Sequence, residues 1–305
     1  MSTTDLTRIM IASDSNDGMD TALAKAARLL EQQDAGQIRV VRTSYDRIAE
    51  EPAEIMPRAD QQALIDSLLG ADREALQQLI DAQRPHGHHT DMEVLWRKQA
   101  ADAIVEAAGK WPAQLLIKPA SRHHGLADFL HTPLDWALSR QAPCPVFISR
   151  NDWQAGVQRI LAAVDMGDPE HVSLNGEILR EACRLGSILG AEVHVATAYP
   201  DLGQAVNELQ VAQDFAGIKA SMRENRQRAL DTLLHDLELS VHQIHLLEGK
   251  AVHVIPALAR DLDAPLSVLG TAARSGVSRL LIGNTAEALV ARMAGDLLTV
   301  RAPWS

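Results

Sequence analysis

The hydrophobic positions of this chain follow two patterns that predict different elements. Short apolar runs, such as residues 160–164, are typical of strands buried in a parallel sheet. Longer segments, such as residues 171–189, carry apolar residues at helical spacing, and Gly190 stands where that helix should end. Strands that alternate with helices predict a mainly parallel sheet with helices on both faces. The predicted fold class is therefore α/β.

The alternation continues through both halves of the chain. In the second half we expect strands at 160–164, 193–199, 241–247, 266–269 and 297–300, and helices at 171–189, 217–239, 252–260 and 280–294. In the first half we expect strands at 9–12, 38–43, 92–96, 115–117 and 146–149, and helices at 19–32, 100–109 and 134–140. Residues 48–84 are interpreted as a long insertion.

The two halves form an internal repeat. Residues 8–14 read RIMIASD and residues 159–165 read RILAAVD, an offset of 151 (159 minus 8). Residues 116–148 and 268–300 align without a gap at an offset of 152 (268 minus 116). The two offsets differ by only one residue, although the segments that give them lie far apart in the chain. This agreement favours duplication over two generic halves that merely look alike. The sequence therefore predicts two domains, residues 1–150 and 151–305, joined by a polar linker.

The amino-acid composition indicates the kind of environment in which the protein is expected to fold. Hydrophobic residues make up 46% and charged residues 23%, as in soluble globular proteins. No apolar run approaches the roughly 18–20 residues of a membrane-spanning helix, and a polar amino terminus leads directly into a strand, so we expect neither membrane insertion nor a signal peptide. Two cysteines are too few for a disulfide framework and suit a reducing compartment. The predicted location is cytoplasmic.

The net charge limits the classes of ligand that the chain is expected to bind. The formal net charge is −11, which argues against direct nucleic-acid binding, because such binding depends on a cationic surface. Aromatic residues are only 3% of the chain, so base-stacking platforms are not expected either. A small anionic ligand is compatible with this charge, since backbone amides at a helix start hold phosphate without help from the net charge.

One segment of the second half carries candidate chemistry. Residues 270–276 read GTAARSG directly after a buried strand, and GNTAE begins at Gly283. In an open α/β sheet, ligands bind at the carboxyl ends of the strands, and the amides of Gly283, Asn284 and Thr285 lie at a predicted helix start that favours an anion. From the residues alone, the glycines equally suit tight turns, and Asn284 and Thr285 equally suit a helix cap.

This segment resembles the nucleotide-binding loop of the universal stress protein family, which reads Gly, two residues, Gly, nine residues, Gly, then Ser or Thr. Gly270 takes the first position, Ala273 stands at the second, and Gly283 takes the third. Asn284 stands at the Ser or Thr position. Asp165, at a strand end, matches the aspartate that family members place near the adenine and ribose.

The resemblance is closest to the tandem E-type subgroup of this family. Residues 283–287 match its Gly-Asn-Thr-Ala-Glu stretch, and residues 132–136 match its Thr-Pro-x-Asp-Trp stretch. Together with the repeat, the resemblance covers nearly the whole chain. It implies two tandem adenine nucleotide alpha hydrolase-like domains, each an open, mainly parallel five-stranded sheet with helices on both faces.

The resemblance also implies a function, namely a stress-response sensor or regulator that binds ATP or a related adenine nucleotide, with or without Mg²⁺, in its second domain. The implied ligand-binding residues are Asp165, Gly270, Ala273, Gly276, Gly283, Asn284 and Thr285. Ala273 departs from the family pattern, and its methyl group crowds a phosphate. We expect no catalytic residues. A slow ATP hydrolase and a scaffold for another anionic or amphipathic small molecule are the alternatives.

The first half has lost this motif. By the offset of 152, the three glycine positions are occupied by Lys118, Ser121 and His131. We favour a vestigial half kept for its packing surface. The alternative is a converted site for a different anion or a metal, built from Lys118, Arg122, His123, His124 and His131.

The remaining histidines do not predict a physiological metal site. His86, His88 and His89 lie in a polar, glycine-containing segment, and His242 and His245 flank a strand and are interpreted as surface or edge residues. Members of the family usually pair through their last strands, so residues 145–149 and 297–301 are expected to form an intramolecular pseudo-dimer. Further association into a homodimer is left open.

Overall fold

A computed structural model describes residues 6–33, 35–83, 88–120, 133–201, 215–271 and 284–302. Its contacts divide the chain into two units, one holding Asp5–Asp152 and the other Trp153–Ser305. The sequence-based boundary after residue 150 falls two residues before this division. Each unit is described by itself.

The first unit is an open, parallel five-stranded sheet in the order β3-β2-β1-β4-β5. Its strands are β1 (Arg8–Ser13), β2 (Gln37–Ser44), β3 (His89–Trp96), β4 (Leu115–Pro119) and β5 (Val146–Ser149). Its helices are α1 (Met19–Leu30), α2 (Arg58–Gln83), α3 (Ala100–Lys110) and α4 (Pro133–Gln141), with a 3₁₀ turn at Arg47–Glu50. The predicted α/β alternation is confirmed here.

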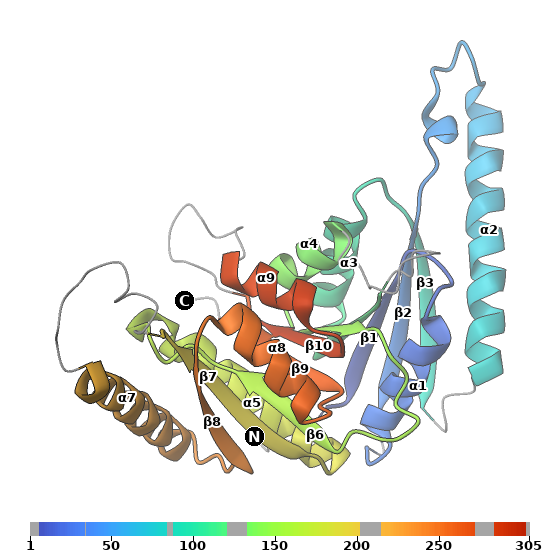
Figure 1. The fold of residues 1–305 in the computed structure, drawn as a ribbon. Coiled ribbons are helices and arrows are strands. Elements are labelled where there is room, and N and C mark those ends of the chain that lie inside the picture. The colour runs from blue at the N-terminus through green and yellow to red at the C-terminus, as the bar shows by residue number, and fades with distance from the viewer. Residues whose placement is uncertain are drawn as a thin grey trace. The chain divides into compact units, whose positions relative to one another are not determined.

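The second unit repeats this arrangement, with the strand order β10-β9-β6-β7-β8. Its strands are β6 (Arg159–Ala163), β7 (Glu192–Tyr199), β8 (Gln243–Glu248), β9 (Leu266–Gly270) and β10 (Asp296–Val300). Its helices are α5 (Val172–Leu189), α7 (Phe215–Asp236), α8 (Ala251–Asp261) and α9 (Asn284–Arg292), with a 3₁₀ turn at Pro169–His171. Figure 1 labels these elements. The same order of pairing in both units is what the internal repeat predicts.

Burial explains why these segments form these elements. All residues of β4 and β10 are buried, as expected for strands of a parallel sheet that helices cover on both faces. Helix α5 buries one face, with Leu174, Ile178, Leu179, Ala182 and Leu185 at the predicted spacing. Gly190 caps this helix at φ 65°, a left-handed conformation that glycine adopts without a steric penalty.

Helix α2 is the main element that the sequence pattern did not resolve. The predicted insertion at residues 48–84 contains this helix of 26 residues, which runs beside β3 (Figure 1). Only Leu76 and Ile80 of the helix are buried. Its apolar residues do recur at helical spacing, and the sequence prediction did not use that signal. Within the described part of the chain, no helix combines the length and the apolar character needed to cross a bilayer.

Candidate functional site

The candidate site lies where β6 and β9 end side by side. These strands pair in parallel, and Ala163 and Leu269 are their last registered pair. The chain therefore leaves β6 as Val164-Asp165 next to the point where β9 ends in Gly270. Two of the predicted ligand-binding residues, Asp165 and Gly270, are thus brought to the same edge of the sheet.

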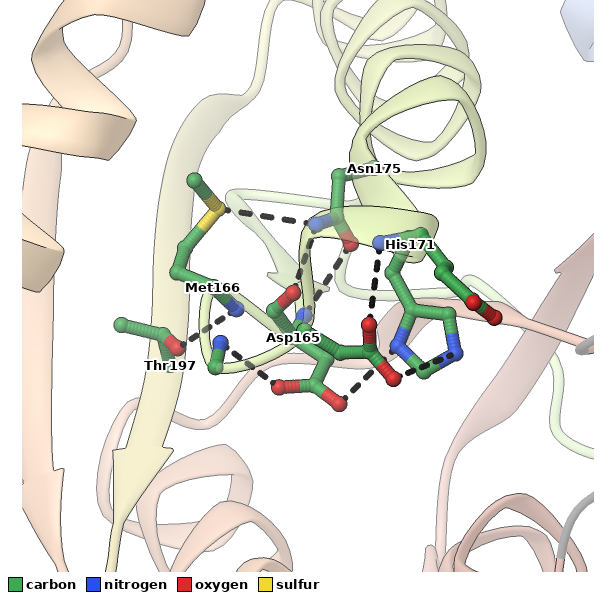
Figure 2. A network of polar contacts seen from close by, with 8 residues as sticks. Asp165, Met166, His171, Asn175 and Thr197 are labelled. Atoms are coloured by element: carbon green, nitrogen blue, oxygen red, sulfur yellow. Dashed lines mark hydrogen bonds and ion pairs between the residues drawn. The ribbon is translucent and has the colours of Figure 1, made fainter.

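The backbone of Asp165 is held by the side chain of Asn175 on α5. The Asp165 N–H donates to Asn175 Oδ1 at 3.0 Å, and Asn175 Nδ2 donates to the Asp165 carbonyl at 2.7 Å (Figure 2). Asn175 is 1% exposed. A buried amide that pairs with both backbone groups of one residue fixes the strand end to the helix. Sequence reasoning missed Asn175, although a polar residue between Leu174 and Ile178 on the buried face was a usable signal.

The carboxylate of Asp165 is oriented but still accessible. Its Oδ1 accepts from the Gly167 N–H at 2.9 Å, and its Oδ2 lies 3.0 Å from Nδ1 of His171. Figure 2 shows His171 and Asn175 on one side of this turn and Thr197, which accepts from the Met166 N–H at 3.4 Å, on the other. The Asp165 side chain is 57% exposed. Its remaining lone pairs can therefore accept hydrogen bonds from a ligand.

An arginine reaches the same turn from α7. A Cβ built on Gly167 would lie 3.0 Å from Nη2 of Arg226 and 3.1 Å from Oδ1 of Asp165. Within the described residues, Nε of Arg226 is buried and has no hydrogen-bond partner. This guanidinium is a candidate contact for an anion. No sequence signal separated Arg226 from the other charged residues of α7.

Gly270 has a packing role that the sequence did not predict. A Cβ at this position would lie 2.7 Å from Cδ2 of Leu174 and 3.0 Å from Cδ1 of Ile178. Helix α5 therefore packs directly against the end of β9, and a side chain at position 270 would require Leu174 and Ile178 to shift. The next amide, of Thr271, donates to the Val300 carbonyl at 2.8 Å and is used within the sheet. Backbone amides that bind a phosphate would therefore have to belong to residues after Thr271.

Gly270→Ala is expected to lower the free energy of unfolding by about 1–3 kcal/mol, the usual cost of overpacking a filled core. Gly70→Ala is the control, because a Cβ on Gly70 in α2 meets nothing within 4 Å. That change should instead stabilise the helix by roughly 0.5–1 kcal/mol. Urea unfolding measures both, and an unchanged value for Gly270→Ala would contradict the close packing.

The other predicted ligand-binding residues are only partly described. Within the described residues, helix α9 runs from Asn284, and Thr285 lies exposed in its first turn. Its first-turn amides have no intrahelical partners. Ala273, Gly276 and Gly283 lie outside the described residues, as does the side chain of Asn284.

The equivalent edge of the first unit is filled by Lys118. Its Nζ donates to the Pro119 carbonyl at 2.6 Å and lies 3.1 Å from Oδ1 of Asp14 and 3.8 Å from Oδ1 of Asp135. Lys118 is 1% exposed. By the repeat, Lys118 stands at the position of Gly270 and Asp14 at that of Asp165. Ser121, Arg122, His123, His124 and His131 of the predicted converted site lie outside the described residues.

Comparisons with known proteins agree with this architecture. The model of the universal stress protein family matches residues 6–150 and 156–301. The chain therefore belongs to the universal stress protein family, with two domains in tandem. It is 28% identical to the universal stress protein E homolog of Haemophilus influenzae, over 96% of each chain. It is also 28% identical to universal stress protein E of Escherichia coli, over 96% of this chain and 93% of that one.

A solved structure shows the same fold over nearly the whole chain. The crystal structure of a functionally unknown protein from Pseudomonas aeruginosa PAO1 superposes with a TM-score of 0.71 and 26% identity, covering 99% of this chain and 94% of that one. The chain is thus a tandem protein of the universal stress protein E type.

Proposed function

We propose that the second unit binds ATP or a related adenine nucleotide, and that the protein acts as a ligand-sensing regulator in stress response. The observation that carries the proposal is the carboxylate of Asp165, which three neighbouring groups orient while more than half of its side chain stays exposed. Hydroxyl groups of a ribose are natural donors to such a carboxylate.

The surroundings of Asp165 fit the phosphate end of a nucleotide. Gly270 puts no side chain at this edge, and Arg226 brings a guanidinium. Helix α9 follows in the chain, and the amides of a helix's first turn lack intrahelical partners. Ala273, Gly276, Gly283 and Asn284 complete the proposed set, together with Thr285. An exposed carboxylate is also an oxygen ligand of the kind that Mg²⁺ accepts.

We propose binding rather than turnover as the main activity. Hydrolysis needs a positioned water and stabilisation of the charge on the transferring phosphoryl group. Both oxygens of the Asp165 carboxylate already contact groups of the protein, which suits a positioning role. A slow hydrolase is the alternative, and it requires Mg²⁺-dependent phosphate release that disappears in Asp165→Asn.

We further propose that the first unit is kept for its packing. Lys118 fills the edge that the second unit leaves without a side chain, and it neutralises Asp14, the counterpart of Asp165. A nucleotide phosphate in this unit would first have to displace that ion pair.

Calorimetric titration of the full chain with ATP, with and without Mg²⁺, tests the proposal. We expect one nucleotide per chain, and at least a tenfold loss of affinity in Asp165→Ala, equivalent to about 1.4 kcal/mol. Gly283→Trp should abolish binding, because it puts a bulky side chain on the loop. Asp236→Asn is the charge-matched control, since the Asp236 side chain is 68% exposed on the same unit.

Equal affinity in Asp165→Ala and in the wild-type chain would refute the assignment. Native mass spectrometry of the purified protein separates the remaining alternative: a copurified adenine nucleotide supports the proposal, whereas a different bound small molecule supports the scaffold. Circular dichroism confirms that each variant is folded.

A further inference from the structure

A second cluster of functional side chains lies at the opposite edge of the second sheet. Glu192 and His194 are at the amino end of β7, and His242 comes directly before β8. Because the strands are parallel, this edge is remote from the carboxyl ends at which Asp165 and Gly270 lie. The His242 N–H donates to the Val193 carbonyl at 2.8 Å, which fixes His242 beside β7.

The side chains converge on one point. Oε2 of Glu192 lies 3.8 Å from Nε2 of His194, and Oε1 of Glu192 lies 3.7 Å from Nδ1 of His242. One ligand atom from each of these three residues lies within 4.8 Å of the other two. Zinc bound by nitrogen and oxygen at about 2.0–2.2 Å needs its ligand atoms roughly 3.4 Å apart. The gap closes by rotation of Glu192 and His242, whose side chains are 47% and 50% exposed.

The central member of the cluster is buried with an unused nitrogen. The His194 side chain is 4% exposed. Among the described residues, its Nε2 is buried without a hydrogen-bond partner, and the nearest acid is the Glu192 carboxylate. An unpaired buried polar atom costs about 1–3 kcal/mol, so its retention needs a reason. A bound cation facing Glu192 would supply that partner.

The other nitrogen of His194 is engaged in the way that metal-binding histidines require. Its Nδ1 lies 3.0 Å from Nε2 of His245 on β8. If Nδ1 carries the proton and donates to His245, then Nε2 presents its lone pair to the cluster.

We propose that Glu192, His194 and His242 bind a divalent transition metal ion, with zinc as the preferred ion. Two imidazoles and one carboxylate form a donor set typical of zinc, and they leave a fourth position for water. Arg159, whose Nε lies 3.4 Å from Oε2 of Glu192, competes for the carboxylate, so zinc must share or displace this exposed ion pair. The site is independent of the proposed nucleotide site.

Sequence reasoning predicted no metal site and placed His242 and His245 at the surface or edge. His242 is exposed as predicted, but His245 is half-buried against His194. The signal that was missed is a histidine two residues after a glutamate in a strand. It becomes meaningful only once the β7–β8 register places His242 beside that pair.

Zinc titration of the untagged full chain, after dialysis against EDTA, tests the site. The chain holds 12 histidines, so single variants must separate this site from adventitious binding. We expect one zinc ion per chain, and at least a tenfold loss of affinity in both His242→Ala and Glu192→Gln. His235→Ala is the control, because the His235 side chain is 90% exposed in the same unit, and its affinity should stay unchanged.

Cobalt substitution provides a second measurement on the same variants. Wild-type protein and His235→Ala should show the visible absorption of tetrahedral Co²⁺, and His242→Ala should lose it. Equal zinc affinity in the wild type, His242→Ala and Glu192→Gln would overturn the proposal, as would zinc binding lost only on replacement of His86, His88 and His89. Both ligand variants alter exposed side chains, so they should fold, and circular dichroism checks that they do.

Discussion

Replacing Lys118 by methionine is expected to lower the free energy of unfolding by about 3 kcal/mol. Lys118 is 1% exposed and Asp135 is 0% exposed, so the ammonium and this carboxylate form a buried ion pair at 3.8 Å. Removal of one partner of a buried ion pair costs about 3–5 kcal/mol, because the other charge stays in a medium that solvates it poorly. Asp14 is 36% exposed and can be rehydrated, so the lower end of this range applies.

Lys110→Met is the matched control for this change. Lys110 is 73% exposed and pairs with Glu106 one turn earlier on α3. An exposed pair of this kind contributes roughly 0.3–0.5 kcal/mol, so the control should unfold almost like the wild type. Urea unfolding of the three proteins gives the comparison. If both variants lose the same small amount, the buried cluster around Lys118 does not hold the first unit together.

Asn175→Ala is expected to cost about 2–4 kcal/mol of stability and to weaken nucleotide binding. The alanine leaves both the N–H and the carbonyl of Asp165 without their partner, and each unpaired buried group costs about 1–3 kcal/mol. The released strand end no longer holds the Asp165 carboxylate in place. Thermal or urea unfolding measures the first effect, and ATP calorimetry measures the second.

We call the two hydrogen bonds between the Asn175 side chain and the Asp165 backbone the clamp. Two further variants separate the effect of losing the clamp from the general effect of removing an amide. Asn175→Asp keeps an oxygen acceptor for the Asp165 N–H but loses the donor to its carbonyl, so we expect an intermediate loss of stability. Asn225→Ala removes an exposed amide of α7 that accepts a hydrogen bond from Arg228, and its effect should stay within about 0.5 kcal/mol. A full loss in Asn225→Ala, or none in Asn175→Ala, would refute the role of the clamp.

The fold could be predicted because its signals are local. Buried parallel strands are continuous apolar runs, and helices such as α5 bury a regular stripe, so both can be recognised without knowing their neighbours. Helix α2 was left unassigned, although its Leu and Ile residues recur at helical spacing. Only two of its residues are buried, so its signal is weaker than that of α5.

The candidate site was predictable only where one residue follows a strand. Gly270 could be found because it directly follows a buried strand, and ligands bind at the carboxyl ends of such strands. Asp165 was assigned through the resemblance to the universal stress protein family. His171 and Arg226 could not be assigned, because each acts on a group of the turn after β6 that only the folded chain brings within reach. The same holds for His194, whose partner His245 lies on a different strand.

The close packing of α5 on Gly270 constrains how the two halves of this duplicated chain can diverge. A lysine at position 270 would meet Leu174 and Ile178, so a counterpart of Lys118 in the second unit requires these side chains to move. Divergence at this strand end is therefore coupled to the packing of the helix against it.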